Sequence, residues 1–234
     1  MARPRASAAA AVLLVPLAAC YVAPAGPVRN ETRTVELQGA ERVRVDVNMA
    51  AGELRLGGGA RNLLDARFRT NLPTPEIRYD ETGVRGVLNV HQRGGGPTVG
   101  NVQNDWDLRL NNDVPLDLDV ALGAGESDLD FSSLSLRGVE VRMGAGELKI
   151  DLTGDYKKSF DVRIRGGVGE ANIRLPSKVG VMVNARGGLG GIGIRGRLRR
   201  RGDGYVNEAY EKSKVTVHVD VRGGIGAINL IAND

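Results

Sequence analysis

Apolar and polar residues alternate in short runs along most of the chain, and glycine-containing corners separate successive runs. The pattern is clearest over residues 139–152, where apolar residues occupy every second position on both sides of the corner at residues 144–146. Because successive side chains of a strand point to opposite faces, this alternation predicts two consecutive strands that share one apolar face. Glycine at the corner permits a positive φ without a clash at Cβ.

The same unit recurs in six copies. When they are aligned on the second corner glycine, the positions seven and five residues before it and four residues after it are apolar in every copy; these glycines are Gly52, Gly125, Gly146, Gly169, Gly190 and Gly226. Consecutive glycines from Gly125 to Gly190 are 21 to 23 residues apart. One turn of a β-solenoid has about this length and buries its apolar face only against neighbouring turns. The sequence therefore predicts an all-β fold of repetitive stacked strands, similar to a β-solenoid or β-helix.

The remaining segments are less regular. Between residues 57 and 121 we expect coils or paired strands with altered corners, including strands over 67–70, 87–92 and 106–110. The last strands are expected over 214–221 and 225–231, after a polar insertion, and no segment has the period of an amphipathic helix. This divides the chain into an N-terminal β region with insertions (35–115) and a repetitive β domain (116–234). An exposed last coil at 225–231 leaves open edge pairing with another chain.

The first residues have the features of a targeting segment. Arg3 and Arg5 precede an apolar stretch at 8–17 that is too short to span a bilayer. The stretch ends in Leu17-Ala18-Ala19-Cys20, which resembles the lipobox of bacterial lipoproteins. That resemblance implies a signal peptide over 1–19, lipidation of Cys20 and a tether over 20–34. The alternative is an ordinary secretory cleavage site beside an incidental cysteine.

Composition agrees with a turn-rich all-β protein. The chain has 33 glycines, only 4% aromatic residues and a single cysteine, so no disulfide supports the fold. Its net charge is +4, of which two charges lie in the leader. This balance is too mild to favour a nucleic-acid partner. With a lipid anchor, we expect the protein on the outer side of the cell membrane or on the outer membrane.

The corner motifs resemble the toast-rack family of secreted bacterial proteins. The resemblance covers most of residues 35–234 and rests on Gly144-Ala145-Gly146-Glu147-Leu148-Lys149-Ile150-Asp151-Leu152, Gly166-Gly167-Val168-Gly169-Glu170-Ala171, Gly187-Gly188-Leu189-Gly190, Tyr205-Val206-Asn207 and Gly223-Gly224-Ile225-Gly226. It implies a rack of stacked strands on the cell envelope with an adhesive or sensory role. The family is related to the C-terminal domain of Lia-F-type proteins of the cell-wall stress response, and it has no established catalytic residues.

Two charged positions recur with the repeat. Glutamate follows the corner in four copies, at Glu53, Glu126, Glu147 and Glu170, and arginine precedes it in four, at Arg142, Arg165, Arg186 and Arg222. Stacked carboxylates could hold a Ca²⁺ column, but ion pairs between the two columns around the corner, with turn N–H groups also donating to the glutamates, are the favoured interpretation. The arginines, together with residues 195–201, are also a candidate anion-binding stripe for an envelope polymer or lipid headgroup. A solvated face that discourages edge pairing is the favoured interpretation of these arginines.

Other candidate chemistry is weak. Residues 188–193 match a dinucleotide-binding pattern, but a strand follows where that motif needs a helix. His91 and His218 alternate with apolar neighbours and are expected to point outward, and no spacing suits a zinc site or a serine nucleophile. The acidic pairs Asp117/Asp119 and Asp128/Asp130 lie on polar strand faces. We therefore expect no cofactor, no metal, no small-molecule substrate and no catalysis. The function predicted is a structural, adhesive or sensory envelope module, with a polysaccharide-binding or polysaccharide-active β-helix as the alternative.

Overall fold

The computed structural model describes residues 23–94 and 98–232. Cys20 and the expected signal peptide lie outside these residues. The described residues contain strands, turns and bends but no helix, so none of them forms a helix that could cross a membrane. The strands are β1 (Ala23–Pro24), β2 (Arg29–Val35), β3 (Arg42–Ala60), β4 (Leu64–Thr70), β5 (Glu76–Thr82), β6 (Arg85–His91), β7 (Thr98–Val99), β8 (Asn104–Asn111), β9 (Leu116–Asp130), β10 (Leu136–Asp151), β11 (Phe160–Leu175), β12 (Gly180–Arg186), β13 (Ile192–Arg195), β14 (Arg199–Arg201), β15 (Gly204–Val206), β16 (Thr216–Arg222) and β17 (Ile225–Ala232).

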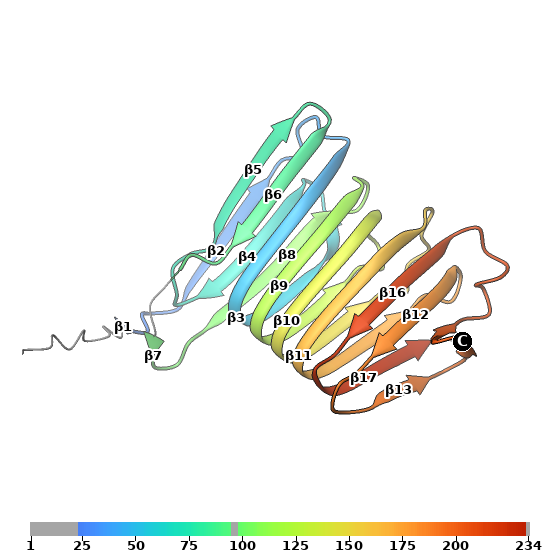
Figure 1. The fold of residues 1–234 in the computed structure, drawn as a ribbon. Helices are drawn as coiled ribbons and strands as arrows, with labels where there is room; N and C mark the ends of the chain where they lie inside the picture. Colours follow the sequence, from blue (N-terminus) through green and yellow to red (C-terminus); the bar gives the residue numbers. More distant parts are fainter. Residues whose placement is uncertain (1–22, 95–97, 233–234) are drawn as a thin grey trace, which may run out of the picture.

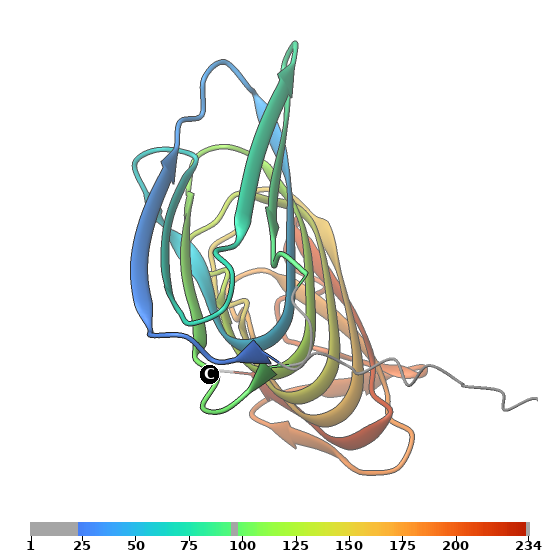
Figure 2. The same ribbon diagram turned by 90° about the vertical axis from the view of Figure 1, so that its left-hand side faces the viewer.

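The predicted all-β stack is confirmed. Strands β3, β9, β10 and β11 each bend at their glycine corner into two limbs, and these strands lie side by side in parallel (Figure 1). The limbs before the corners form a first face, in the order β5-β6-β3-β9-β10-β11-β16-β12-β15-β14. The limbs after the corners form a second face, in the order β2-β4-β8-β3-β9-β10-β11-β17-β13. The two faces meet along a line of corners that we call the corner ridge (Figure 2).

The parallel strands are in register from coil to coil, so each repeat position forms a column along the stack. Val141, for example, pairs with Val120 on one side and Ile164 on the other. Most inward positions of both limbs are buried aliphatic side chains. Exceptions in the second limb include the buried Ser127 and the two isoleucines of the edge strand β13, Ile192 and Ile194, which are each 37% exposed. The core runs without interruption from Ala40 to Leu230, so a chain of residues 21–234 retains every described strand and all of this core.

The corner glycines form the tightest column. Gly125, Gly146, Gly169, Gly226 and Gly190 have φ between 127° and 143°. A Cβ on any of them would overlap the carbonyl oxygen of the corner glycine in the preceding coil. Glycine is therefore required here twice over, by its backbone conformation and by the space between coils.

The coils do not stack in chain order. The coil formed by β16 and β17 lies between β11 and the coil formed by β12 and β13 (Figure 1). The prediction that residues 225–231 form the exposed last coil is therefore wrong, and β13 is the edge strand of the second face instead. Strand β17 is long, and its Ile228 and Leu230 are buried, whereas β13 has four residues, including Gly193. Short strands are the ones that sheets place at an edge.

The irregular N-terminal part forms paired strands, as expected. Strands β4, β6 and β8 confirm the three strands predicted between residues 67 and 110. Strands β8, β4 and β2 extend the second face, and β6 and β5 extend the first. Phe68 and Trp106 fill this end of the core in an edge-to-face contact, with ring centroids 5.5 Å apart. The division of the chain at residues 115 and 116 stays a prediction.

Asn207 lies in the polar insertion (residues 196–214) and links it by hydrogen bonds to the outermost coil, which β12 and β13 form. Its side chain is buried and accepts a hydrogen bond from the Val181 N–H at 3.0 Å. Its amide group donates to the carbonyl oxygens of Val179 at 2.8 Å and Pro176 at 3.1 Å. This gives a structural role to the Tyr205-Val206-Asn207 motif, since one side chain satisfies three backbone groups.

We predict that Asn207→Ala lowers the free energy of unfolding by about 2–3 kcal/mol, because it leaves buried backbone groups without partners. Urea unfolding of residues 21–234 measures this. Asn184→Ala, a substitution of a half-buried asparagine in the same coil, is the control and is expected to cost less than about 1 kcal/mol. Equal losses for both variants would contradict the role given to Asn207.

The corner column gives a second prediction. Gly169→Ala combines an unfavourable φ of 137° with an overlap on the Gly146 carbonyl, and is expected to cost about 3 kcal/mol or more. Gly166→Ala, in the same strand, places its Cβ in open space and is expected to change stability by less than about 1 kcal/mol. Thermal and urea unfolding compare the two. A Gly169→Ala protein as stable as the Gly166→Ala protein would show that the corner is not tightly packed.

Candidate functional site

The predicted arginine stripe is a continuous column on the first face. Arg142 pairs in register with Arg165, Arg165 with Arg222, and Arg222 with Arg186. Neighbouring strands lie about 4.8 Å apart, so four guanidinium groups follow one another along the stack. All four side chains are exposed. The order of the coils places Arg186 last, although it precedes Arg222 in the sequence.

Acidic side chains partly neutralise this column. Arg142 donates to Asp119 at 2.7 Å and to Glu140 at 3.0 Å. Arg165 donates to the same Glu140 oxygen at 2.7 Å, and Arg222 donates to Asp220 at 3.1 Å. Partial burial lowers the pKa of Arg142, but its bonds to Glu140 and Asp119 outweigh burial and raise the pKa overall. These contacts hold three of the four guanidinium groups, those of Arg142, Arg165 and Arg222, beside acidic side chains.

The predicted ion pairing between the two columns around the corner is wrong. Glu53 pairs with Arg55 and Glu147 with Lys149, both at 3.0 Å, while Glu170 accepts a hydrogen bond from Asn229 at 2.7 Å. The glutamates lie on the second face, where the residue two positions along points to the same side and is nearer than anything across the ridge. The hydrogen bond to Glu147 raises the pKa of Lys149.

The glutamate column gives no support to a calcium site. Glu53, Glu126, Glu147 and Glu170 are stacked in register. Within residues 23–94 and 98–232, however, no three His, Cys, Asp or Glu side chains are placed to hold one metal ion. Lysine, arginine and asparagine neighbours hold three of the four carboxylates instead.

A shallow hollow lies beside the arginine column. It has a volume of about 490 Å³, and Arg142 and Arg165 line it together with Asn48, Ala121 and Gly144. The apolar residues Met49, Leu122 and Met143 line it as well. The hollow therefore gives a ligand on the first face access to both guanidinium groups beside a largely apolar lining.

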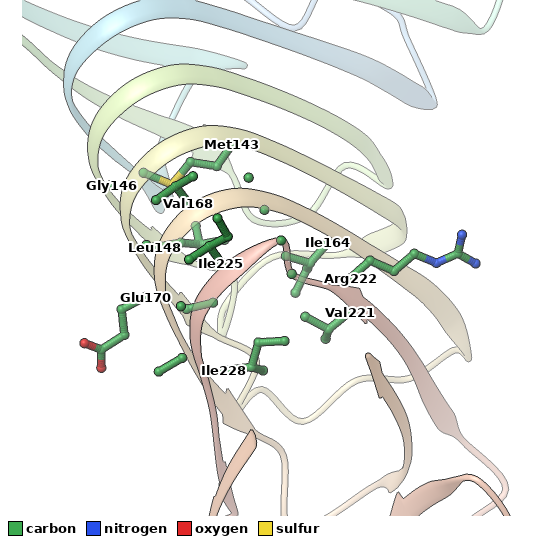
Figure 3. A pocket seen from close by; sticks show the side chains of 18 residues that line it. Met143, Gly146, Leu148, Ile164, Val168, Glu170, Val221, Arg222, Ile225 and Ile228 are labelled. Atoms are coloured by element: carbon green, nitrogen blue, oxygen red, sulfur yellow. The ribbon is translucent and has the colours of Figure 1, made fainter. Parts of the chain in front are cut away.

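The sequence interpretation missed a third column, which is the tip of the corner ridge. Three large apolar side chains here are exposed over much of their surface: Val168 by 54%, Ile225 by 53% and Leu189 by 74%. Val168 and Ile225 also line a narrow slot of about 40 Å³ beneath the corner. Figure 3 shows Arg222 and Glu170 pointing in opposite directions, with Val168 and Ile225 at the bends between them. The sequence signal was available, since these three residues replace alanine between the two corner glycines.

The remaining candidates have structural explanations. Residues 188–193 form the corner between β12 and strand β13, as predicted, and no helix follows that corner. His91 and His218 are exposed, also as predicted. Asp117 pairs with Arg137 at 3.1 Å, and Asp119 pairs with Arg44 and Arg142. These acids therefore belong to ion pairs on an outer face.

The chain was compared with protein families and with solved structures. The family described as the N-terminal domain of toast_rack, DUF2154, matches residues 24–174. The solved structure of a proposed cell adhesion protein from Clostridium sporogenes is 31% identical, with a TM-score of 0.81, over 88% of this chain and 100% of that one. A proposed adhesin from Bacteroides fragilis is 8% identical, with a TM-score of only 0.29, over 88% of this chain and 99% of that one. No protein with a curated description matches the sequence.

Proposed function

Because the chain belongs to the toast-rack family, we propose that it is a non-enzymatic interaction module of the bacterial cell envelope with an adhesive role. The similarity to the Clostridium protein, which is named for cell adhesion, supports this role. We further propose that Cys20 is lipidated and holds the module on the outer side of the cell membrane or on the outer membrane. A sensory part in the cell-wall stress response, through the relation to Lia-F-type proteins, stays a prediction.

The arginine column is the observation that carries this proposal. Four guanidinium groups at regular spacing on a flat, exposed face suit a ligand that is long, anionic and repetitive. An anionic polymer of the cell envelope has these properties. Each contact is weak because the face is open to solvent and salt, and several contacts made together supply the affinity.

The alternative is a β-helix protein that binds or cleaves a polysaccharide. A polysaccharide-active β-helix needs a cleft that holds a sugar chain between two carboxyl groups of different pKa. The acids on the first face are held in ion pairs with arginine, and the hollow beside them is shallow. This geometry favours recognition of charge over recognition of sugar rings.

We predict that residues 21–234 bind dextran sulfate and isolated cell-wall fractions, and that salt weakens the binding. The quadruple variant Arg142→Gln/Arg165→Gln/Arg186→Gln/Arg222→Gln is expected to bind dextran sulfate at least tenfold more weakly. The control removes four other exposed arginines, Arg61→Gln/Arg67→Gln/Arg69→Gln/Arg85→Gln, with the same change in net charge. Binding titrations at two salt concentrations compare the proteins.

Each outcome of this titration has a clear meaning. Equal loss in both quadruple variants would show that net charge alone matters and would refute a site at the column. Binding to neutral dextran that is as tight as binding to dextran sulfate would favour the polysaccharide alternative. Failure to bind either polymer or the wall fractions would rule out the anionic-polymer ligand.

A second prediction uses the acid that restrains the column. Glu140 pairs with Arg142 and Arg165 at once. Glu140→Gln releases Arg165 and leaves Arg142 paired with Asp119 alone. It is therefore expected to tighten binding to dextran sulfate by about two- to threefold, the size of one exposed ion-pair interaction. Glu147→Gln makes the same charge change on the second face, where Glu147 pairs with Lys149, and is expected to leave the affinity nearly unchanged. Equal gains would place the binding site elsewhere.

A further inference from the structure

The tip of the corner ridge changes character halfway along the stack. In register, its residues are Ala51, Ala124, Ala145, Val168, Ile225 and Leu189. The first three coils therefore present methyl groups, and the last three present large aliphatic side chains to solvent. The three large residues are neighbours in adjacent coils, so they form one apolar strip, which we call the ridge strip.

The charges beside the ridge change at nearly the same place. On the second face, the position two residues after the tip is glutamate in the first four coils but Ala227 and Gly191 in the last two. On the first face, the position three residues before the tip is arginine beside the whole strip, at Arg165, Arg222 and Arg186. The strip is thus bordered by positive charge and, in its outer two coils, by no glutamate.

The start of the described chain lies at the other end of the same ridge. Strand β1 pairs with β7, and residues 100–103 lead from β7 into β8. At the start of β8, Asn104 donates to the Ala51 carbonyl at the first corner at 2.6 Å. Figure 1 shows β1 and β7 beside the line of corners that runs down to β17 and β13. A chain attached to a membrane near Ala23 therefore has this edge close to the membrane.

We propose that the ridge strip inserts into the surface of a lipid bilayer with anionic headgroups, so that the stack lies lengthwise along the membrane. Each flanking arginine precedes its strip residue by three positions, about 10 Å of extended chain. Apolar side chains that enter the boundary between headgroups and acyl chains reach about 5–10 Å deep. The arginine stems can then lie along the apolar layer while their guanidinium groups stay among lipid phosphates.

A bilayer fits the strip better than a second copy of the chain does. Stable protein interfaces bury about 800 Å² per partner, far more than three partly exposed aliphatic side chains provide. Two copies meeting at this strip would also bring their arginines face to face. A membrane needs only a few inserted side chains when charge attraction assists them. This contact requires neither lipidated Cys20 nor polymer binding, because the strip lies on the described fold itself.

The test is binding of residues 21–234 to vesicles of phosphatidylcholine alone and of phosphatidylcholine mixed with phosphatidylglycerol. We expect binding to the mixed vesicles and a loss of at least tenfold in the variant Ile225→Ser/Leu189→Ser. The matched control, Val84→Ser/Val87→Ser, changes two exposed valines of the β5–β6 hairpin and is expected to bind like the unchanged protein. The ridge variant keeps all four arginines of the column, so its binding to dextran sulfate is expected to persist.

Insertion has its own spectroscopic readout. Trp106 is the single tryptophan and is buried in the core, so it does not sense the membrane. Leu189→Trp adds a reporter on the strip, and its emission is expected to shift to the blue and to be quenched by brominated lipid when mixed vesicles are added. Val84→Trp, on the distant hairpin, is expected to do neither.

Four results would overturn the proposal. The first is absence of binding to both kinds of vesicle, and the second is equal binding by the two serine variants. The third is vesicle binding without a blue shift at Leu189→Trp, which would assign the contact to surface charge alone. The fourth is a dimer in sedimentation that Ile225→Ser/Leu189→Ser abolishes, which would make the strip an interface between two copies.

Discussion

The rest of the structure depends on the close contact between the corner glycines of adjacent coils. Parallel strands lie about 4.8 Å apart, and at the corner this spacing leaves room for a backbone but not for a Cβ. Gly146 and Gly169, for example, each stand against the carbonyl oxygen of the corner glycine before them. As long as that position is glycine, each coil bends at the same point and all other positions fall into register.

Register turns a repeated sequence into columns with uniform chemistry. Any residue type that recurs at one repeat position becomes a line of that residue along the stack, as Arg142, Arg165, Arg222 and Arg186 do on the first face. The acidic residues at the neighbouring positions then determine which arginines are held in ion pairs and which can contact a ligand. Glu140 restrains two arginines, so the same columns that build a charged face also set how much of its charge a ligand can reach.

The sequence was sufficient to predict the strands of the repeats, the corners and the register of the arginine column, because all three follow from periodicity alone. Strands β2, β5, β14 and β15 lie outside the repeats and were not predicted, and β2 occupies part of the segment that was expected to be a tether. The order of the coils could not be predicted, since β13 and β17 carry the same alternation and differ only in length and in residues such as Gly193. Ion-pair partners were predicted wrongly because the alignment does not show that the ridge separates Arg142 from Glu147. The ridge strip was missed because Val168, Ile225 and Leu189, read singly, look like core residues.

The corner also shows how this fold can vary its surface without losing stability. In the first three coils Met49, Leu122 and Met143 are buried beneath the corner, and the tip is alanine. In the last three coils these inner positions are Gly166, Gly223 and Gly187, and the tip is valine, isoleucine or leucine. The large apolar side chain thus lies inside the bend in the first three coils and outside the bend in the last three. The narrow slot beneath Val168 and Ile225 lies where the first three coils have a methionine or leucine side chain. The glycine column between the two positions is unchanged. A toast-rack corner can therefore present either an inert or an apolar edge while the stack beneath it stays the same, and this separates the residues that fold the protein from those that decide what it touches.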